Sequence, residues 1–236
     1  MIRPRFIASL FLFAFAFFFC TETFAQDRAQ LVQEIDALKR QIIVKETAFL
    51  EPSAQDKAAF ASFLSQPNSG LIRLLPRETY EKKLSVNGGG AFYSFGRLTH
   101  EYGYGSDISL EQGKFSVGFA GADLGFLLDL GDTAIESVNQ NNSKLNFLLE
   151  FTPPSQEPKA RKQQQKASTG FSSDDGQFYI NRLEAKDHTT YALRSINYGR
   201  SDLLVAFRVV RKDEDGSVII AWKFIEIFPV PQLERP

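Results

Sequence analysis

The chain has 236 residues, and its 27 basic side chains nearly balance its 28 acidic ones. This balance gives no general electrostatic attraction to nucleic acid or to an anionic membrane surface, so the charge argues against both classes of partner. The length is sufficient for one substantial domain or for two small ones.

Residues 1–25 have the pattern of a secretory signal peptide. Arg3 and Arg5 precede an unbroken apolar run at 6–19, and a short polar stretch then ends in the small residue Ala25. This pattern is typical of an exported protein, so we expect cleavage after Ala25 and a periplasmic or extracellular location. An uncleaved anchor is the alternative. The run is shorter than the ~20 apolar residues that a spanning helix needs, so we expect no membrane span after cleavage.

The single cysteine, Cys20, lies inside this leader. It follows the bulky Phe19, whereas lipid attachment requires a small residue before the cysteine. A chain without the leader contains no cysteine, which excludes disulfides and a thiol nucleophile. Its stability must therefore come from burial of side chains.

Residues 26–50 are predicted to form an amphipathic helix. Four apolar side chains recur at spacings of four, three and four and so lie on one stripe of a helix, at Leu31, Ile35, Leu38 and Ile42. Lys45 interrupts the stripe after about two heptads, whereas a coiled coil is normally assigned over three or four. Two interpretations stand. The segment is either a short coiled coil that joins copies of the chain into a homo-oligomer, or a helix packed on its own domain.

Residues 51–152 and 177–236 are predicted to form one domain. Ser53 followed by Asp56 indicates the start of a second, short helix, because these residues can form an imperfect capping box. The stretch SDISLEQGKFSVGF then alternates apolar and polar residues on both sides of Gln112-Gly113, which predicts a β-hairpin.

Alternating or continuous apolar patterns predict five further strands, at 122–132, 144–152, 189–198, 202–212 and 217–228. The last two are apolar on both faces, as central strands are, and a tight turn joins them. We therefore expect an α+β fold, in which one or two N-terminal helices precede a largely antiparallel sheet that curls into a sandwich or an open barrel.

Residues 153–176 are polar, contain proline and have almost no apolar side chains. This composition predicts a long disordered insertion between strands. Its positive charge comes from Lys159, Arg161, Lys162 and Lys166. Such a charge run is more often solvated than bound to an anionic partner.

The stretch NGGGAFYSFGRLTHEYGYGSD, residues 87–107, invites a functional interpretation. Its three glycines are not followed by the lysine of a phosphate-binding loop, and Asn87-Gly88 instead favours a hairpin turn. The pair His100-Glu101 lacks the second histidine that a zinc-binding helix places four residues later. We therefore expect no metal and no cofactor.

The same stretch combines aromatic side chains with carboxylates, which can stack on and hydrogen-bond to a glycan or a protein ligand. The candidate ligand-binding residues are Tyr93, His100, Glu101, Tyr102, Tyr104 and Asp107. In the alternative interpretation, Tyr93 and Phe95 face the core and the other tyrosines stabilise turns.

These patterns favour an exported, non-enzymatic binding or interaction module. Neither a nucleophile elbow nor a Cys-His pair supports an enzyme, and no catalytic residue is assigned. One alternative is a secreted hydrolase that uses carboxylates near Glu101 and Asp107. Another is a carrier of apolar ligands, with a cavity lined by Phe115, Phe119, Phe126 and Phe147.

Overall fold

The computed structural model describes residues 7–100, 102–103, 105–174 and 176–234, with side chains from residue 27 onward. The chain divides into two compact units, Met1–Thr47 and Ala48–Pro236. Helices and antiparallel strand pairs both occur among the described residues. The fold class is therefore α+β, as the sequence predicts.

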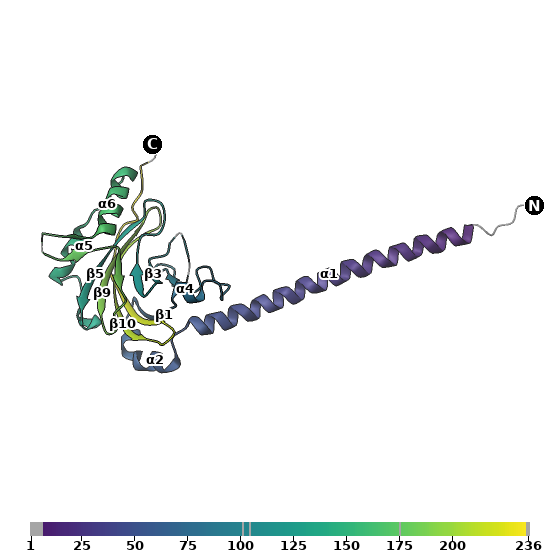
Figure 1. Cartoon of the computed structure of the whole chain (residues 1–236), viewed down its shortest axis with the longest axis horizontal. Helices are drawn as coiled ribbons and strands as arrows, with labels where there is room; N and C mark the ends of the chain where they lie inside the picture. Colours follow the sequence, from purple (N-terminus) through teal and green to yellow (C-terminus); the bar gives the residue numbers. More distant parts are fainter. Residues whose placement is uncertain (1–6, 101, 104, 175, 235–236) are drawn as a thin grey trace, which may run out of the picture. The chain divides into compact units, whose positions relative to one another are not determined.

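The first unit consists of helix α1 (Ile7–Leu50), whose last three residues belong to the second unit (Figure 1). The predicted helix at 26–50 lies within α1. Over the part of the chain that the structure describes, no helix is both long enough and apolar enough to cross a membrane.

The second unit is organised around a five-stranded sheet. Its strands follow the spatial order β1, β11, β10, β9, β5, so three consecutive strands of the chain lie at its centre. The strands are β1 (Ser69–Leu74), β5 (Leu124–Gly131), β9 (Thr190–Asn197), β10 (Ser201–Lys212) and β11 (Val218–Ile227). The tight turn between β10 and β11 and the strands predicted at 122–132, 189–198, 202–212 and 217–228 are confirmed.

Both faces of this sheet are buried, because successive side chains of a strand point to opposite faces. In β10, Leu203, Val205 and Phe207 contribute to one hydrophobic cluster. Leu204 and Ala206 contribute to the other cluster. This arrangement explains why the strand has a continuous apolar run rather than an alternating pattern.

A four-stranded sheet covers one face of the five-stranded sheet. Its order is β2, β3, β4, β8, and its strands are β2 (Phe92–Tyr93), β3 (Ile108–Glu111), β4 (Lys114–Ser116) and β8 (Arg182–Glu184). Strands β3 and β4 form the hairpin predicted from the sequence, with Glu111 opposite Lys114 and the turn at Gln112-Gly113. Both residues of the turn have positive φ, 50° and 68°, as a two-residue turn of this kind requires.

Helices and a short ribbon cover the other face (Figure 1). These elements are α3 (Ala61–Leu64), the 3₁₀ turns η1 (Ile135–Ser137) and η2 (Ser143–Leu145), α5 (Asn146–Glu150), α6 (Glu157–Thr169) and the ribbon of β6 (Phe171–Ser172) with β7 (Phe178–Tyr179), and α2 (Ala54–Ala59) directly precedes α3. Phe63, Leu148 and Tyr179 bring α3, α5 and the ribbon into one hydrophobic cluster.

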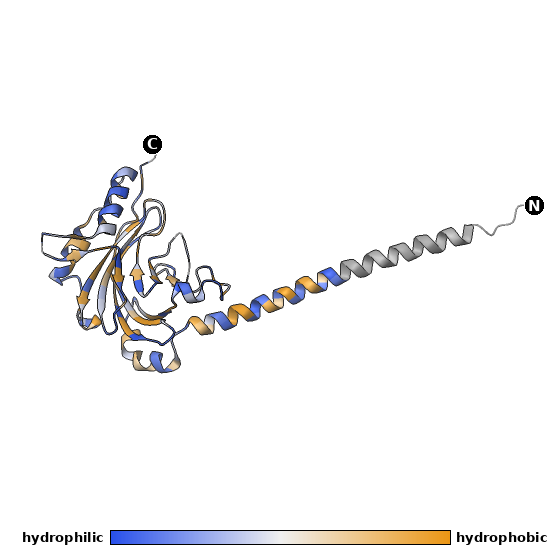
Figure 2. Cartoon of the chain, in the orientation of Figure 1, coloured by the Kyte–Doolittle hydropathy of each residue, from blue (hydrophilic) through white to orange (hydrophobic). Residues whose placement is uncertain are grey.

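The prediction of a disordered segment at 153–176 is wrong for helix α6. The helix buries Ala160 and Ala167, which are seven residues apart and so lie on one face, and its other positions are largely hydrophilic (Figure 2). Gln164 also donates from Nε2 to the carbonyl oxygen of Asp123, at 2.9 Å. Small side chains allow close packing on β5, although they add little to the apolar composition on which the prediction of disorder rested.

The prediction of a strand at 144–152 is also wrong, because this segment folds into η2 and α5. Asn142 accepts a hydrogen bond from the backbone N–H of Lys144 at 3.1 Å and so starts the helical turns. Leu145 and Leu148 are then buried together at a spacing of three residues. The alternation that suggested a strand also contains this helical spacing, and tertiary packing selects the helix.

The start of the second unit follows the predicted capping pattern. The backbone N–H of Asp56 donates to Oγ of Ser53 at 3.1 Å, and the N–H of Ser53 donates to Oδ2 of Asp56 at the same distance. The predicted hairpin at Asn87-Gly88 is wrong, because α4 (Arg77–Tyr80) and successive turns precede β2 in place of a strand. The glycine cluster does form a turn, and Gly88 has a φ of +81°.

Candidate functional site

The most distinctive surface of the described residues is the apolar stripe of α1. The side chains of Leu31, Ile35, Leu38 and Ile42, termed the α1 stripe below, are between 44% and 58% exposed. Val32 and Ile43 are exposed beside them. Hydrophobic and hydrophilic positions alternate along this part of the helix (Figure 2). Exposed apolar side chains that adjoin one another indicate an interaction surface more strongly than scattered ones do.

Charged side chains flank the α1 stripe. Glu34 accepts a hydrogen bond from Nε2 of Gln30 at 3.0 Å, one helical turn away. Lys39 approaches Asp36 at 4.0 Å, and both side chains are exposed. These contacts within one helix are weak, since exposed ion pairs contribute roughly 0–1 kcal/mol. Glu34 and Lys39 can therefore exchange them for contacts with a second helix at small cost.

Asp107, predicted to face a ligand, is instead fully buried. Its carboxylate accepts hydrogen bonds from the backbone N–H of Phe95 at 2.7 Å, from Oγ of Ser195 at 2.7 Å and from Nδ2 of Asn197 at 3.0 Å. We call these four residues the Asp107 cluster. Burial raises the pKa of Asp107 to about 6, and the hydrogen bonds oppose that rise. The cluster ties the loop after β2 to strand β9.

His100 and Tyr93 also point into the protein. Nε2 of His100 lies 2.7 Å from the carbonyl oxygen of Arg73, and its ring packs edge-on against Tyr93 with centroids 5.1 Å apart. Burial lowers the pKa of His100 and raises that of Tyr93 to about 12, so both side chains are neutral at pH 7. Phe95 packs on Tyr93 and is buried, as the alternative interpretation expects.

Of the members of the predicted set that the structure describes, Tyr102 is the exposed one, with 43% of its surface exposed. Its ring packs edge-on against Phe92 at 4.6 Å, and the guanidinium of Arg77 lies 5.6 Å from its centroid. Glu101 and Tyr104 lie outside the described residues. The structure therefore packs His100, which is partly buried, against the buried Tyr93 and leaves Tyr102 on the surface, so these three do not share one ligand-facing side.

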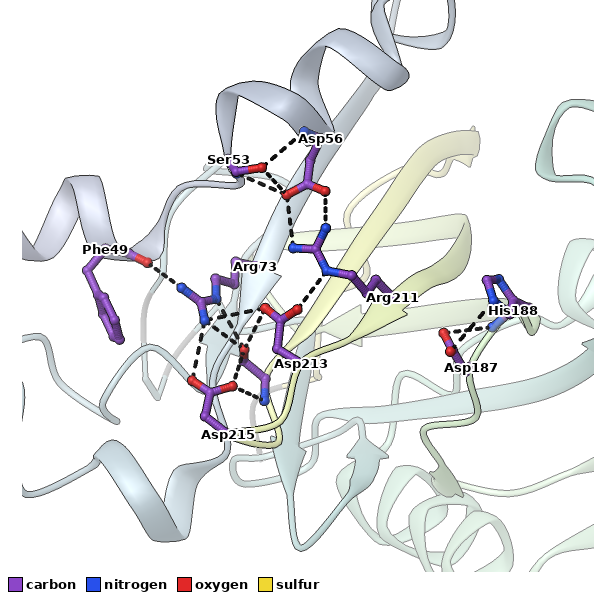
Figure 3. Close-up of polar contacts among 10 residues, drawn as sticks. Phe49, Ser53, Asp56, Arg73, Asp187, His188, Arg211, Asp213 and Asp215 are labelled. Atoms are coloured by element: carbon purple, nitrogen blue, oxygen red, sulfur yellow. Dashed lines mark hydrogen bonds and ion pairs between the residues drawn. The ribbon is translucent and has the colours of Figure 1, made fainter.

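A network of charged side chains anchors the start of the second unit (Figure 3). Arg73 on β1 donates to the carbonyl oxygen of Phe49 at 3.3 Å and to Oγ of Ser217 at 2.9 Å. Its guanidinium also lies 3.4 Å from Asp213 and 3.3 Å from Asp215, in the turn between β10 and β11. The arginine thus joins the end of α1, the edge strand and this turn.

Arg211 completes the network by joining Asp56 and Asp213 (Figure 3). Burial opposes ionisation of Asp56, but hydrogen bonds from Arg211 and Ser53 outweigh it and hold the pKa of Asp56 below its ordinary value. All of these charges have opposite-charge partners inside the protein. The network therefore has a structural role that is sufficient to explain why these charged residues lie together.

The second histidine, His188, is exposed beside Asp187 in the turn before β9 (Figure 3). Its Nε2 lies 3.6 Å from the carboxylate of Asp187. Among the residues whose structure is described, no group of three or more His, Cys, Asp or Glu side chains is arranged to hold a metal ion.

The phenylalanines proposed to line an apolar cavity are distributed over different packing regions. Phe115 belongs to the cluster between the two sheets, and its ring contacts that of Phe207 at 5.1 Å. Phe126 belongs to the cluster under the helices, where its ring contacts that of Phe147 at 5.3 Å. Phe119 contacts Phe92 at 5.4 Å. Because the two clusters lie on opposite faces of the five-stranded sheet, these side chains do not share one cavity.

One surface depression was not anticipated from the sequence. It has a volume of about 270 Å³ and is lined by Val138, Asn139, Gln140, Asn141, Lys223, Phe224 and Ile225. It arises where β11 extends beyond its edge partner β1, whose pairing ends at Ser69 opposite Lys223. Nε2 of Gln140 donates to the carbonyl oxygen of Ile225 at 3.1 Å and so partly occupies this edge. The unequal lengths of the two strands could have been noticed only after their pairing was known.

Comparisons of the chain with protein-family models, curated proteins and solved structures gave no match.

Proposed function

We propose that the protein is an exported, non-enzymatic interaction module that assembles with copies of itself through the α1 stripe. The observation that carries this proposal is the exposure of four apolar side chains at coiled-coil spacing on helix α1, in the part that follows residue 25. The signal-peptide pattern of residues 1–25 supports export.

Association through the stripe is favourable for two physical reasons. Each stripe side chain is about half exposed, so covering it contributes on the order of 1 kcal/mol in each helix. In addition, an isolated helix is marginally stable in water, because most helical stability in proteins comes from packing of an apolar face. A partner helix therefore stabilises α1 at the same time as α1 binds it.

The interior of the second unit supports a structural rather than a catalytic role for Asp107. A carboxylate that acts on a substrate must reach it, whereas this carboxylate is fully buried and accepts hydrogen bonds from three residues of its cluster. This burial is sufficient to explain why the pKa of Asp107 is raised.

We also infer that the second unit is a sandwich of two sheets rather than an open barrel. An open barrel is one sheet that curls on itself, whereas the order β1, β11, β10, β9, β5 and the order β2, β3, β4, β8 belong to separate sheets. The hydrophobic cluster shared by the two sheets supports face-to-face packing.

The proposal is tested by the mass of the chain beginning at Gln26, measured by light scattering after size-exclusion chromatography over a range of concentrations. We expect an assembly larger than the monomer for the unaltered chain and a monomer for Ile35→Ser/Leu38→Ser. The matched control, Gln33→Ser/Arg40→Ser, changes two positions outside the stripe and should keep the assembly. Circular dichroism and the melting temperature establish that the second unit is folded in each case. An unaltered chain that stays monomeric at all concentrations contradicts the proposal.

A further inference from the structure

The residues of the α1 stripe fit the two kinds of core position of a coiled coil. Spacings of four, three and four place Leu31 and Leu38 at d positions and Ile35 and Ile42 at a positions of successive heptads. β-Branched residues at a combined with leucine at d favour two parallel helices over three or four. The stripe therefore contains information on the number of helices as well as on the fact of association.

The charges beside the stripe point to the same arrangement. In this heptad register Glu34 is a g residue and Lys39 is the e residue five positions later. Two parallel helices in register bring each g residue next to the following e residue of the other helix, and such pairs set partner choice and direction. Glu34 of each copy would then face Lys39 of the other, and the two-fold symmetry of a dimer forms this pair twice. Antiparallel helices place g opposite g and e opposite e, which does not bring these two residues together.

Charged residues at both ends of the α1 stripe limit the length of the coiled coil. Arg28 and Lys45 occupy the next a and d positions on either side of the stripe, and charged residues there destabilise a coiled-coil core. Four apolar layers are therefore available, so the association is expected to be reversible and to depend on concentration.

We infer that the α1 stripe binds a second copy of this chain as a parallel, in-register, two-stranded coiled coil. This inference rests on the proposed function and adds the partner, the stoichiometry and the direction of the helices. Because both second units follow the C-terminal ends of the paired helices, the dimer presents two copies of the domain from one end of the coiled coil.

Single cysteines test the direction, because the chain from Gln26 contains no other cysteine. Leu31→Cys and Leu38→Cys are each oxidised under mild conditions in separate preparations, with Arg40→Cys as a control that faces away from the seam. Parallel helices in register place each d residue beside its own copy, so we expect disulfide-linked dimers for both variants and little cross-linking of the control. Antiparallel helices can bring at most one of the two positions beside its own copy.

Charge exchange tests the register independently. Glu34→Lys places two lysines beside each other in each pair, and we expect dimerisation to weaken on the order of tenfold. The double variant Glu34→Lys/Lys39→Glu restores opposite charges and should recover most of the lost affinity, measured by sedimentation equilibrium at low salt.

The possible outcomes separate this inference from the proposed function. Cross-linking at both d positions, a mass of two chains and recovery in the double variant support a parallel dimer. An assembly that needs the stripe but cross-links at only one d position, contains three or more chains, or is not recovered by the double variant overturns the inference and leaves the proposed function standing. A chain that is monomeric at every concentration overturns both.

Discussion

Asp107 should make the free energy of unfolding depend on pH in a direction opposite to that of an ordinary ion-paired carboxylate. Burial raises its pKa from 3.8 to about 6, so between these values the folded chain holds a proton that the unfolded chain has lost. Stability contributed by this proton is fully present below about pH 4 and is lost as the pH rises through about 6. The perturbation that isolates the effect is Asp107→Asn, which cannot ionise.

The magnitude follows from the size of the shift. A rise of roughly two pKa units corresponds to about 3 kcal/mol, of which about 2 kcal/mol falls between pH 4 and pH 7. Other carboxylates also titrate in this range, but they contribute equally to the two chains and cancel in the difference. The substitution adds an offset that does not depend on pH, because an amide cannot satisfy every donor in the Asp107 cluster.

The assay is urea unfolding of both chains at intervals from pH 4 to pH 7. We expect the stability of the unaltered chain relative to Asp107→Asn to fall by about 2 kcal/mol over this range. A second variant, Asn197→Ala, removes one hydrogen bond to the carboxylate and should move the midpoint of the change to higher pH. A stability difference that is constant with pH, or that rises with pH, would refute the reasoning.

Three substitutions test the packing and the buried ion pair of the second unit. Gly70→Ala should lower the free energy of unfolding by about 1–3 kcal/mol, because a Cβ atom at this position would lie 2.6 Å from the indole nitrogen of Trp222. The control Gly96→Ala should be tolerated, because the nearest atom there is 3.6 Å away. Equal melting temperatures for the two variants would contradict this prediction. Asp202→Asn should cost about 3–5 kcal/mol in urea unfolding, because Arg194 is buried and donates to both carboxylate oxygens of Asp202, at 2.9 and 2.8 Å. A cost below about 1 kcal/mol would show that the pair is not needed to satisfy the arginine.

Elements whose evidence is local could be predicted from the sequence. The hairpin at Gln112-Gly113 alternates apolar and polar residues, the central strands are apolar runs, and turn residues lie close to both in the sequence. The capping box of Ser53 and Asp56 is a pattern of four residues and was recognised for the same reason. Helix α6 was missed because its buried face consists of Ala160 and Ala167 among charged residues, a face that hydrophobic composition does not reveal.

The burial of Asp107 and the inward position of His100 could not be read from the chain. Asp107 is held by Ser195 and Asn197, which follow it by 88 and 90 residues, and only the folded sheet brings them together. The position of the His100 ring is likewise fixed by the carbonyl oxygen of Arg73, which lies 27 residues earlier in the sequence. The α1 stripe could be predicted because the periodicity of a single helix is sufficient to define it.

Hydrogen exchange of the backbone amides in α1 tests the central claim, assembly through the α1 stripe, most directly. The measurement compares the chain from Gln26 at low and at high concentration, with mass spectrometry of peptides that cover residues 31–42 and of peptides from the second unit. We predict that protection of residues 31–42 increases with concentration, that protection in the second unit does not change, and that Ile35→Ser/Leu38→Ser abolishes the increase. Exchange of residues 31–42 that is the same at every concentration would contradict the claim.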